Sequence, residues 1–220
     1  MIAPRRAAAR GGRTAVVVAL SSLLVLTGCQ AAAPAPADPT TATSPSAGST
    51  VKTSSFSTLD AAGVESIRNT KTARLDMSSG RLEKDAVRVT KDSYGPEINT
   101  RDSGKINLSI LAPNGEITAE TDRIRFNTTD KRTDFSEVTY FLTASSADEY
   151  FELIRDGVRR YGISAESAEE WISSTQADPA SKSDFSITPG TDTGLTVNYD
   201  LRYDGGKDTQ VIIVHILPAG

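Results

Sequence analysis

The chain of 220 residues contains one histidine and one cysteine. His215 lies in a C-terminal segment where apolar and polar residues alternate, which predicts a strand. If Gly205 and Gly206 form a two-residue hairpin loop, Thr196 lies opposite His215 on the partner strand. The nearest carboxylate on that face, Asp200, is then roughly 13 Å away along the strand. A catalytic row needs hydrogen-bond contact between its members, so we predict a Thr–His hydrogen bond and no catalytic site.

Other patterns that support catalysis or metal binding are absent from the sequence. One cysteine and one histidine exclude disulfide frameworks, iron–sulfur clusters and zinc sites built mainly from these residues. The 28 acidic residues offer too many carboxylate pairs to select one for glycoside hydrolysis. The chain also lacks an Asp-rich calcium loop and a glycine-rich phosphate loop. We therefore predict that the protein is not an enzyme and has no cofactor, no catalytic residues and no metal ligands.

Two groups of side chains have the chemistry to recognise a partner. Arg123 and Arg125 alternate on a predicted strand, where they could contact an anionic group. Trp171, Tyr199 and Tyr203 could line a groove for a sugar or a peptide. Aromatic residues at helix and strand spacing are more often core residues, and we favour that interpretation for these three.

The N-terminal segment predicts export. Four arginines in the first 13 residues precede twelve largely apolar residues, 15–26. A membrane-spanning helix needs roughly twenty apolar residues, so this run is typical of a signal peptide. Leu26-Thr27-Gly28-Cys29 follows and resembles the lipobox of bacterial lipoproteins. The resemblance implies a signal peptide at 1–28, cleavage between Gly28 and Cys29, and acylation of Cys29. A secretory signal with an unrelated cysteine and an uncleaved anchor are the alternatives.

Cleavage would make the chain more acidic. Removing four arginines and no acidic residue changes the formal net charge from −4 to −8. Such a chain is a poor candidate for binding nucleic acid or anionic lipid. We therefore expect attachment to the membrane through the acyl chains on Cys29, which contribute about 0.8 kcal/mol per buried CH₂. The expected location is the extracytoplasmic face of the cell membrane.

Composition divides the mature chain into two parts. Residues 29–55 hold the lipidated cysteine followed by Ala, Pro, Thr and Ser, which predict a disordered tether. Residues 56–220 predict a single α+β domain with an antiparallel sheet and two to three helices packed on one face. The expected elements are a helix near 60–69 capped by Asp60, a strand around 86–90, a hairpin turning at 113–116, a strand at 138–142, helices starting after Ser146 and Ser164, and a final hairpin turning at 204–207.

Two local patterns in this domain are specific. Ser146-Ala147-Asp148-Glu149 is a capping box, and Gly162 suits a left-handed helix end. The apolar positions change from odd to even between Ala119 and Ile124, so we predict a bulge or a break near 120–123.

The order of elements from the capped helix onward resembles a known group of proteins. A strand, the Ser146-capped helix ending at Tyr161-Gly162, a second segment opened by Ser164 and a long hairpin are similar to small actinobacterial lipoproteins of the mycobacterial LppA type. The resemblance covers about the last 80 residues. It implies a location in the cell envelope and no particular activity.

These observations favour a lipid-anchored envelope protein that binds a protein or cell-wall partner without catalysis. An open sheet edge formed by the last hairpin is one route to such binding. The alternative is a carrier of a small apolar ligand or lipid, which needs an apolar cavity of roughly 300–1,000 Å³ between sheet and helices. Hydrolysis in the cell wall is the least favoured hypothesis.

Replacing Cys29 with serine tests the proposed anchor. Cys29→Ser removes the thiol that would carry the acyl chains, so the protein should leave the membrane fraction and lose acyl labelling. Fractionation and metabolic labelling with a fatty-acid probe measure both effects. Extraction of the variant by detergent alone would show instead that the apolar segment is the anchor.

Overall fold

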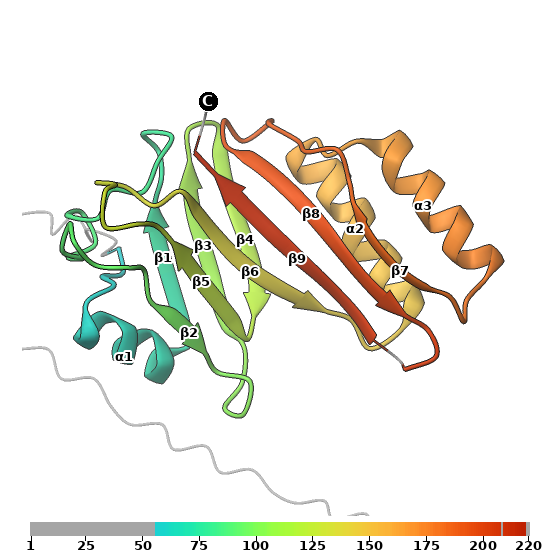
Figure 1. Ribbon diagram of the computed structural model, residues 1–220, viewed down its shortest axis with the longest axis horizontal. Coiled ribbons are helices and arrows are strands. Elements are labelled where there is room, and N and C mark those ends of the chain that lie inside the picture. Colours follow the sequence, from blue (N-terminus) through green and yellow to red (C-terminus); the bar gives the residue numbers. More distant parts are fainter. Residues whose placement is uncertain (1–55, 208, 219–220) are drawn as a thin grey trace, which may run out of the picture. The chain divides into compact units, whose positions relative to one another are not determined.

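The computed structural model describes residues 56–207 and 209–218. These residues form three helices and two sheets, which confirms the α+β class and adds a second sheet to the one that was expected (Figure 1). The helices are α1 (Ala61–Thr70), α2 (Ala147–Tyr161) and α3 (Ala165–Ala177). The strands are β1 (Thr72–Asp76), β2 (Glu97–Asn99), β3 (Ile106–Ala112), β4 (Gly115–Thr121), β5 (Arg123–Asn127), β6 (Glu137–Thr143), β7 (Lys182–Ser186), β8 (Thr196–Asp204) and β9 (Thr209–Leu217).

The larger sheet has six antiparallel strands in the order β2-β5-β6-β9-β8-β7. Burial alternates along β8 and β9 because successive side chains of a strand point to opposite faces. The buried face packs against α2 and α3, and in Figure 1 the strands β7 and β8 pass in front of α2. Tyr203 contacts both helices, since its ring centre lies 6.1 Å from that of Tyr150 and 5.9 Å from that of Trp171.

The predicted ends of α2 and α3 are confirmed. The Ser146 hydroxyl accepts the Glu149 N–H at 3.2 Å, and Ser164 caps α3 in the same way. Gly162 ends α2 with a φ of 70°, in the left-handed region that glycine adopts without strain. The capping box differs in one detail, because the Glu149 carboxylate accepts the N–H of Ser145 and not that of Ser146.

The smaller sheet contains β1, β3 and β4 in the order β1-β3-β4. β3 and β4 form the predicted hairpin, and β1 pairs in parallel with β3. Its inner side chains join the core together with Val64 and Ile67 of α1, whose cap is Asp60 as predicted. The predicted break falls at Asp122, where the chain leaves β4 in the small sheet and enters β5 in the large one.

Three predictions about strands are wrong. Residues 86–90 form turns and not a strand. The last hairpin closes at the pair Asp204–Thr209, so its loop has four residues, and His215 lies opposite Asn198 instead of Thr196. This hairpin is also not at the sheet edge, because β8 pairs with β7 and β9 pairs with β6 on their outer sides. The strand β7 reads Lys-Ser-Asp-Phe-Ser, which is too polar to be recognised as a strand from its pattern.

Lys84 holds together the irregular segment between β1 and β2. Its side chain is fully buried, and Nζ donates to the backbone carbonyls of Lys91, Ser93 and Thr129 at 2.8, 2.9 and 2.8 Å. These three acceptors lie on two loops far apart in sequence. A single buried amino group therefore bonds the backbone of both loops and is itself fully satisfied by them.

Replacing Lys84 with methionine should destabilise the domain strongly. The variant keeps most of the apolar stem but leaves three carbonyl groups without a donor, which should cost about 2–4 kcal/mol. Urea denaturation measures this loss, and Lys91→Met, which changes an exposed side chain in the same loop, is the matched control. Equal midpoints for the two variants would contradict the structural role of Lys84.

Candidate functional site

A groove of about 800 Å³ lies between the outer face of the small sheet and α2. Tyr140, Leu142 and Thr143 of β6 line the groove. From α2 come Glu149, Leu153, Asp156 and Arg160, which are three or four residues apart and therefore lie on one face of the helix. The lining residues are Thr72, Arg74, Lys105, Asn107, Leu108, Ser109, Glu116, Thr118, Ala119, Glu120, Tyr140, Leu142, Thr143, Glu149, Leu153, Asp156, Arg160 and Tyr161.

Arg160 fixes one end of the groove by joining α2 to β4. Its guanidinium donates to Asp156 Oδ2 at 3.1 Å and to Thr118 Oγ1 at 2.6 Å. The Tyr161 hydroxyl donates to the Thr118 carbonyl at 3.3 Å, and Arg160 Cζ lies 4.9 Å from the centre of the Tyr161 ring. Burial raises the pKa of Tyr140 and of Tyr161, so both remain neutral phenols at neutral pH. This end of the groove is therefore preformed.

Three charged side chains in the groove, Arg74, Lys105 and Glu120, form no ion pair or hydrogen bond within the described part of the protein. Arg74 lies on β1 and Glu120 on β4, and both are exposed. The register places Arg74 opposite Ser109 and places Asn107 opposite Glu120 on the same face. Two strand spacings separate β1 from β4, and the two residues lie in adjacent rows of this face, so their Cα atoms are roughly 12 Å apart across the groove wall.

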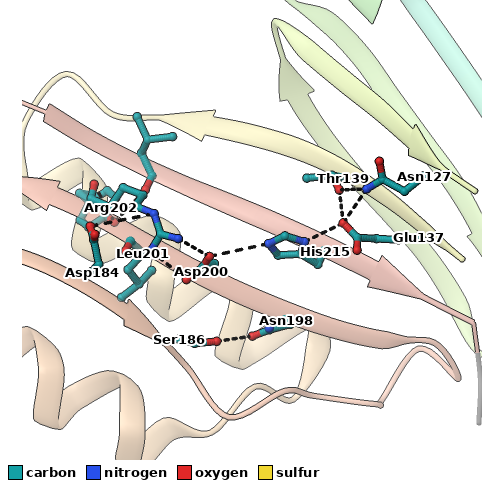
Figure 2. A network of polar contacts seen from close by, with 12 residues as sticks. Asn127, Glu137, Thr139, Asp184, Ser186, Asn198, Asp200, Leu201, Arg202 and His215 are labelled. Atoms are coloured by element: carbon teal, nitrogen blue, oxygen red, sulfur yellow. Dashed lines mark hydrogen bonds and ion pairs between the residues drawn. The ribbon is translucent and has the colours of Figure 1, made fainter. Parts of the chain in front are cut away.

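A second polar cluster lies on the opposite, uncovered face of the large sheet, and Figure 2 shows it in detail. His215 Nδ1 donates to Glu137 Oε1 at 2.7 Å, and Nε2 lies 3.9 Å from Asp200 Oδ2. Arg202 holds Asp200 through two hydrogen bonds of 3.0 and 2.6 Å. Asn127 donates to Glu137 at 3.1 Å. The cluster thus connects strands β5, β6, β9 and β8.

This cluster corrects the predicted environment of the histidine. The expected Thr196–His215 hydrogen bond is wrong, because Thr196 pairs with Leu217. The expected separation from Asp200 is also wrong, since a register shift of two residues brings that carboxylate next to the imidazole. Glu137 comes from β6, 78 residues earlier, and no local pattern could have identified it.

The cluster has carboxylates on both sides of a base, and the hydroxyl that is bonded to one of them is buried. The Thr139 hydroxyl donates to Glu137, and Thr139 is only 3% exposed. A hydroxyl that is buried and already bonded to a carboxylate cannot attack a substrate in solution. We therefore interpret the cluster as a charge network that fixes the register of the sheet.

The other residues selected from the sequence also have structural roles. Arg123 and Arg125 each donate to Glu97, at 2.9 and 2.7 Å, and lie over the Phe141 ring. Trp171, Tyr199 and Tyr203 are core residues, with exposed fractions of 6%, 2% and 3%. Gly28, Cys29 and the tether at 29–55 lie outside the described residues.

Two searches of the described residues gave negative results. No group of three or more His, Cys, Asp or Glu side chains is arranged to hold a metal ion in this part of the chain. None of its helices combines the length and apolarity needed to cross a membrane.

Comparison with known proteins gives no assignment. No protein-family model matches the chain, and no curated protein or solved structure is significantly similar to it.

The residues of the groove were missed by sequence analysis for a specific reason. Arg74 belongs to the alternating segment Thr-Ala-Arg-Leu-Asp, in which Ala73 and Leu75 are buried. That alternation was a usable signal for a strand with a polar outer face. The pairing of this strand with β3 depends on a long-range parallel contact, which the local sequence does not contain.

Glu137→Gln should reduce stability in a way that depends on pH. The hydrogen bond from His215 is the main cause of the lowered pKa of Glu137, with further bonds from Thr139 and Asn127. A carboxylate with a lowered pKa stabilises the fold above its ordinary value of 4.5, and this contribution is lost as the pH falls through the lowered pKa. The variant should lose about 1 kcal/mol at pH 7, a modest amount for a partly exposed pair.

Denaturation curves between pH 7 and pH 3 measure this effect. The difference between wild type and variant should shrink below pH 4.5. Glu170→Gln, at an exposed position of α3, serves as the control and should show no such change. A difference that stays constant over the whole range would contradict the role given to the ionised carboxylate.

Proposed function

We propose that this protein is a lipid-anchored, non-enzymatic binding module on the extracytoplasmic face of the cell membrane. Its lipidation at Cys29 rests on the lipobox resemblance. The binding site in this proposal is the groove between the small sheet and α2, which holds a segment of a protein or cell-wall partner.

The observation that carries the proposal is the charge pattern of the groove. Arg74 and Glu120 line an open depression of about 800 Å³ and are left without partners within the described chain. Thr72, Asn107 and Ser109 lie between or beside them and add hydroxyl and amide groups. A ligand that carries both an anionic and a cationic group, as a short peptide segment does, is complementary to such a wall.

The lining also bears on the alternative of an apolar carrier. The volume is in the range that a small apolar ligand requires. Apolar side chains such as Leu142 and Leu153 form only part of the lining, and charged groups occur on both walls. Placing an apolar ligand against Arg74 and Glu120 would remove water from these charges without replacing it, so the lining favours a polar ligand.

The carboxylates of the groove support binding more than hydrolysis. Asp156 accepts hydrogen bonds from Arg159 and Arg160, and Glu116 accepts one from Ser109. A glycosidase needs two carboxyl groups that converge on one bond, one of them able to release a proton. Glu149 likewise accepts a hydrogen bond from Ser145, which leaves Glu120 as the lining carboxylate without a bonded partner among the described residues, and one free carboxylate does not make such a pair.

Site-specific crosslinking in living cells tests the proposal. A photoreactive benzoylphenylalanine at Ser109 stands in the groove and should form an adduct with the partner in the full chain at native level. The same probe at Ser173, exposed on α3, should form none. Arg74→Glu should reduce the Ser109 adduct at least fivefold, because it reverses the charge that the ligand meets.

A matched charge reversal elsewhere completes the experiment. Arg81→Glu changes an exposed arginine in a turn away from the groove and should leave the adduct at its wild-type level. Adducts from Ser173 but not from Ser109 would contradict the assignment of the groove. Equal losses from Arg74→Glu and Arg81→Glu would show a response to net charge alone.

A further inference from the structure

The uncovered face of the large sheet is a second surface that the groove does not use. We call this surface the open face, and it consists of the outward side chains of β5, β6, β8 and β9 with those of the edge strands. On the four central strands, each of these outward side chains is half-buried or exposed, except that of Thr139, which is buried. Its apolar members are Phe141, Val211, Ile213 and Leu217.

In one row of paired residues across this face, the side chains change in charge and polarity from one edge of the sheet to the other. Asn99 pairs with Arg123, whose guanidinium carbon lies 4.9 Å from the Phe141 ring centre. Phe141 pairs with Ile213, which pairs in turn with Asp200. The row ends at Ser186 on β7. Read from β2 to β7, the side chains are polar, cationic, apolar, apolar, anionic and polar.

That order is complementary to itself. A two-fold axis that runs parallel to the strands between β6 and β9 exchanges β5 with β8 and β6 with β9. Two open faces packed about this axis would place Arg123 of one copy against Asp200 of the other, and Phe141 against Ile213. An in-plane axis perpendicular to the strands would instead place Arg123 against Arg123. The charge order thus selects one arrangement.

The adjacent row agrees with the same axis. It contains Arg125, Thr139, His215 and Asn198 in neighbouring strands. The axis places Arg125 opposite Asn198 and Thr139 opposite His215 of the second copy. No like charges meet in either row, although each copy has charges of both signs on this face.

The size of the face is at the lower end of the range for specific dimers. Six strands with spacings of about 4.8 Å give a width of roughly 24 Å, and strands of this length give a similar height. The flat area of the face is on the order of 600 Å² per copy. This is somewhat below the roughly 800 Å² that each partner buries in a stable interface, but it does not include the surface of protruding side chains. We propose that two copies of this chain associate through their open faces, leaving both grooves accessible.

Complementary charge reversals test this pairing in the full chain. Two differently tagged copies are co-expressed, solubilised from membranes in detergent and purified through one tag. Copies that both carry Arg123→Asp place two aspartates in contact, and copies that both carry Asp200→Arg place two arginines in contact. Co-purification should fall at least tenfold for each of these matched pairs.

The mixed pair distinguishes loss of contact from loss of folding. A copy with Arg123→Asp meets opposite charges at both contacts with a copy that carries Asp200→Arg, so co-purification should return to near the wild-type level. Arg68→Asp on α1, away from the open face, should have no effect. Wild-type copies that do not co-purify, matched variants that co-purify normally, or a mixed pair that is not restored would each overturn the proposal.

Discussion

The change of sheet at Asp122 determines where the groove can form. Thr121 is 1% exposed, and its Oγ1 lies 2.8 and 2.9 Å from the carbonyl oxygens of Phe141 and Arg123, which share its one hydrogen, and accepts the Phe141 N–H at 3.2 Å. These bonds hold the end of β4 against β6 just before the chain enters β5. The small sheet therefore stands over one half of the large sheet while α2 and α3 cover the other half. The groove is the space left between them.

β6 then supplies both surfaces of the protein. Its buried side presents Tyr140 to the groove, and its open side presents Phe141 to the row with Arg123 and Ile213. The two surfaces lie on opposite faces of one strand because side chains alternate along it. A partner in the groove and a second copy on the open face would thus not compete for the same atoms. The charge network around His215 keeps β6, β8 and β9 in the register on which the open-face row depends.

The sequence predicted those features that depend on neighbouring residues. The caps at Asp60, Ser146 and Ser164 each need one side chain within three residues, and all three are present. The parity change before Ile124 was enough to predict the break, although it could not reveal that a second sheet begins there. The α+β class followed from the same local patterns.

The features that the sequence analysis predicted wrongly or missed depend on contacts between distant segments. The final hairpin was placed two residues out of register because the loop length had to be assumed, and the periodicity of two kept His215 on the correct face. The strand β7 has a single apolar residue, Phe185, and its pairing with β8 overrides its weak intrinsic preference. Lys84 resembles any surface lysine in sequence, and only the folding of two loops around it explains its burial.

Amide hydrogen exchange tests the central claim, that the groove between the small sheet and α2 is the binding site. The full chain is compared in native membranes, where its partner is present, and after purification in detergent. A ligand held in the groove should slow exchange in β4 and in α2, which contribute residues to its two walls, and should leave α3 unchanged. Identical exchange in β4 and α2 under both conditions, or protection confined to α3, would contradict the account.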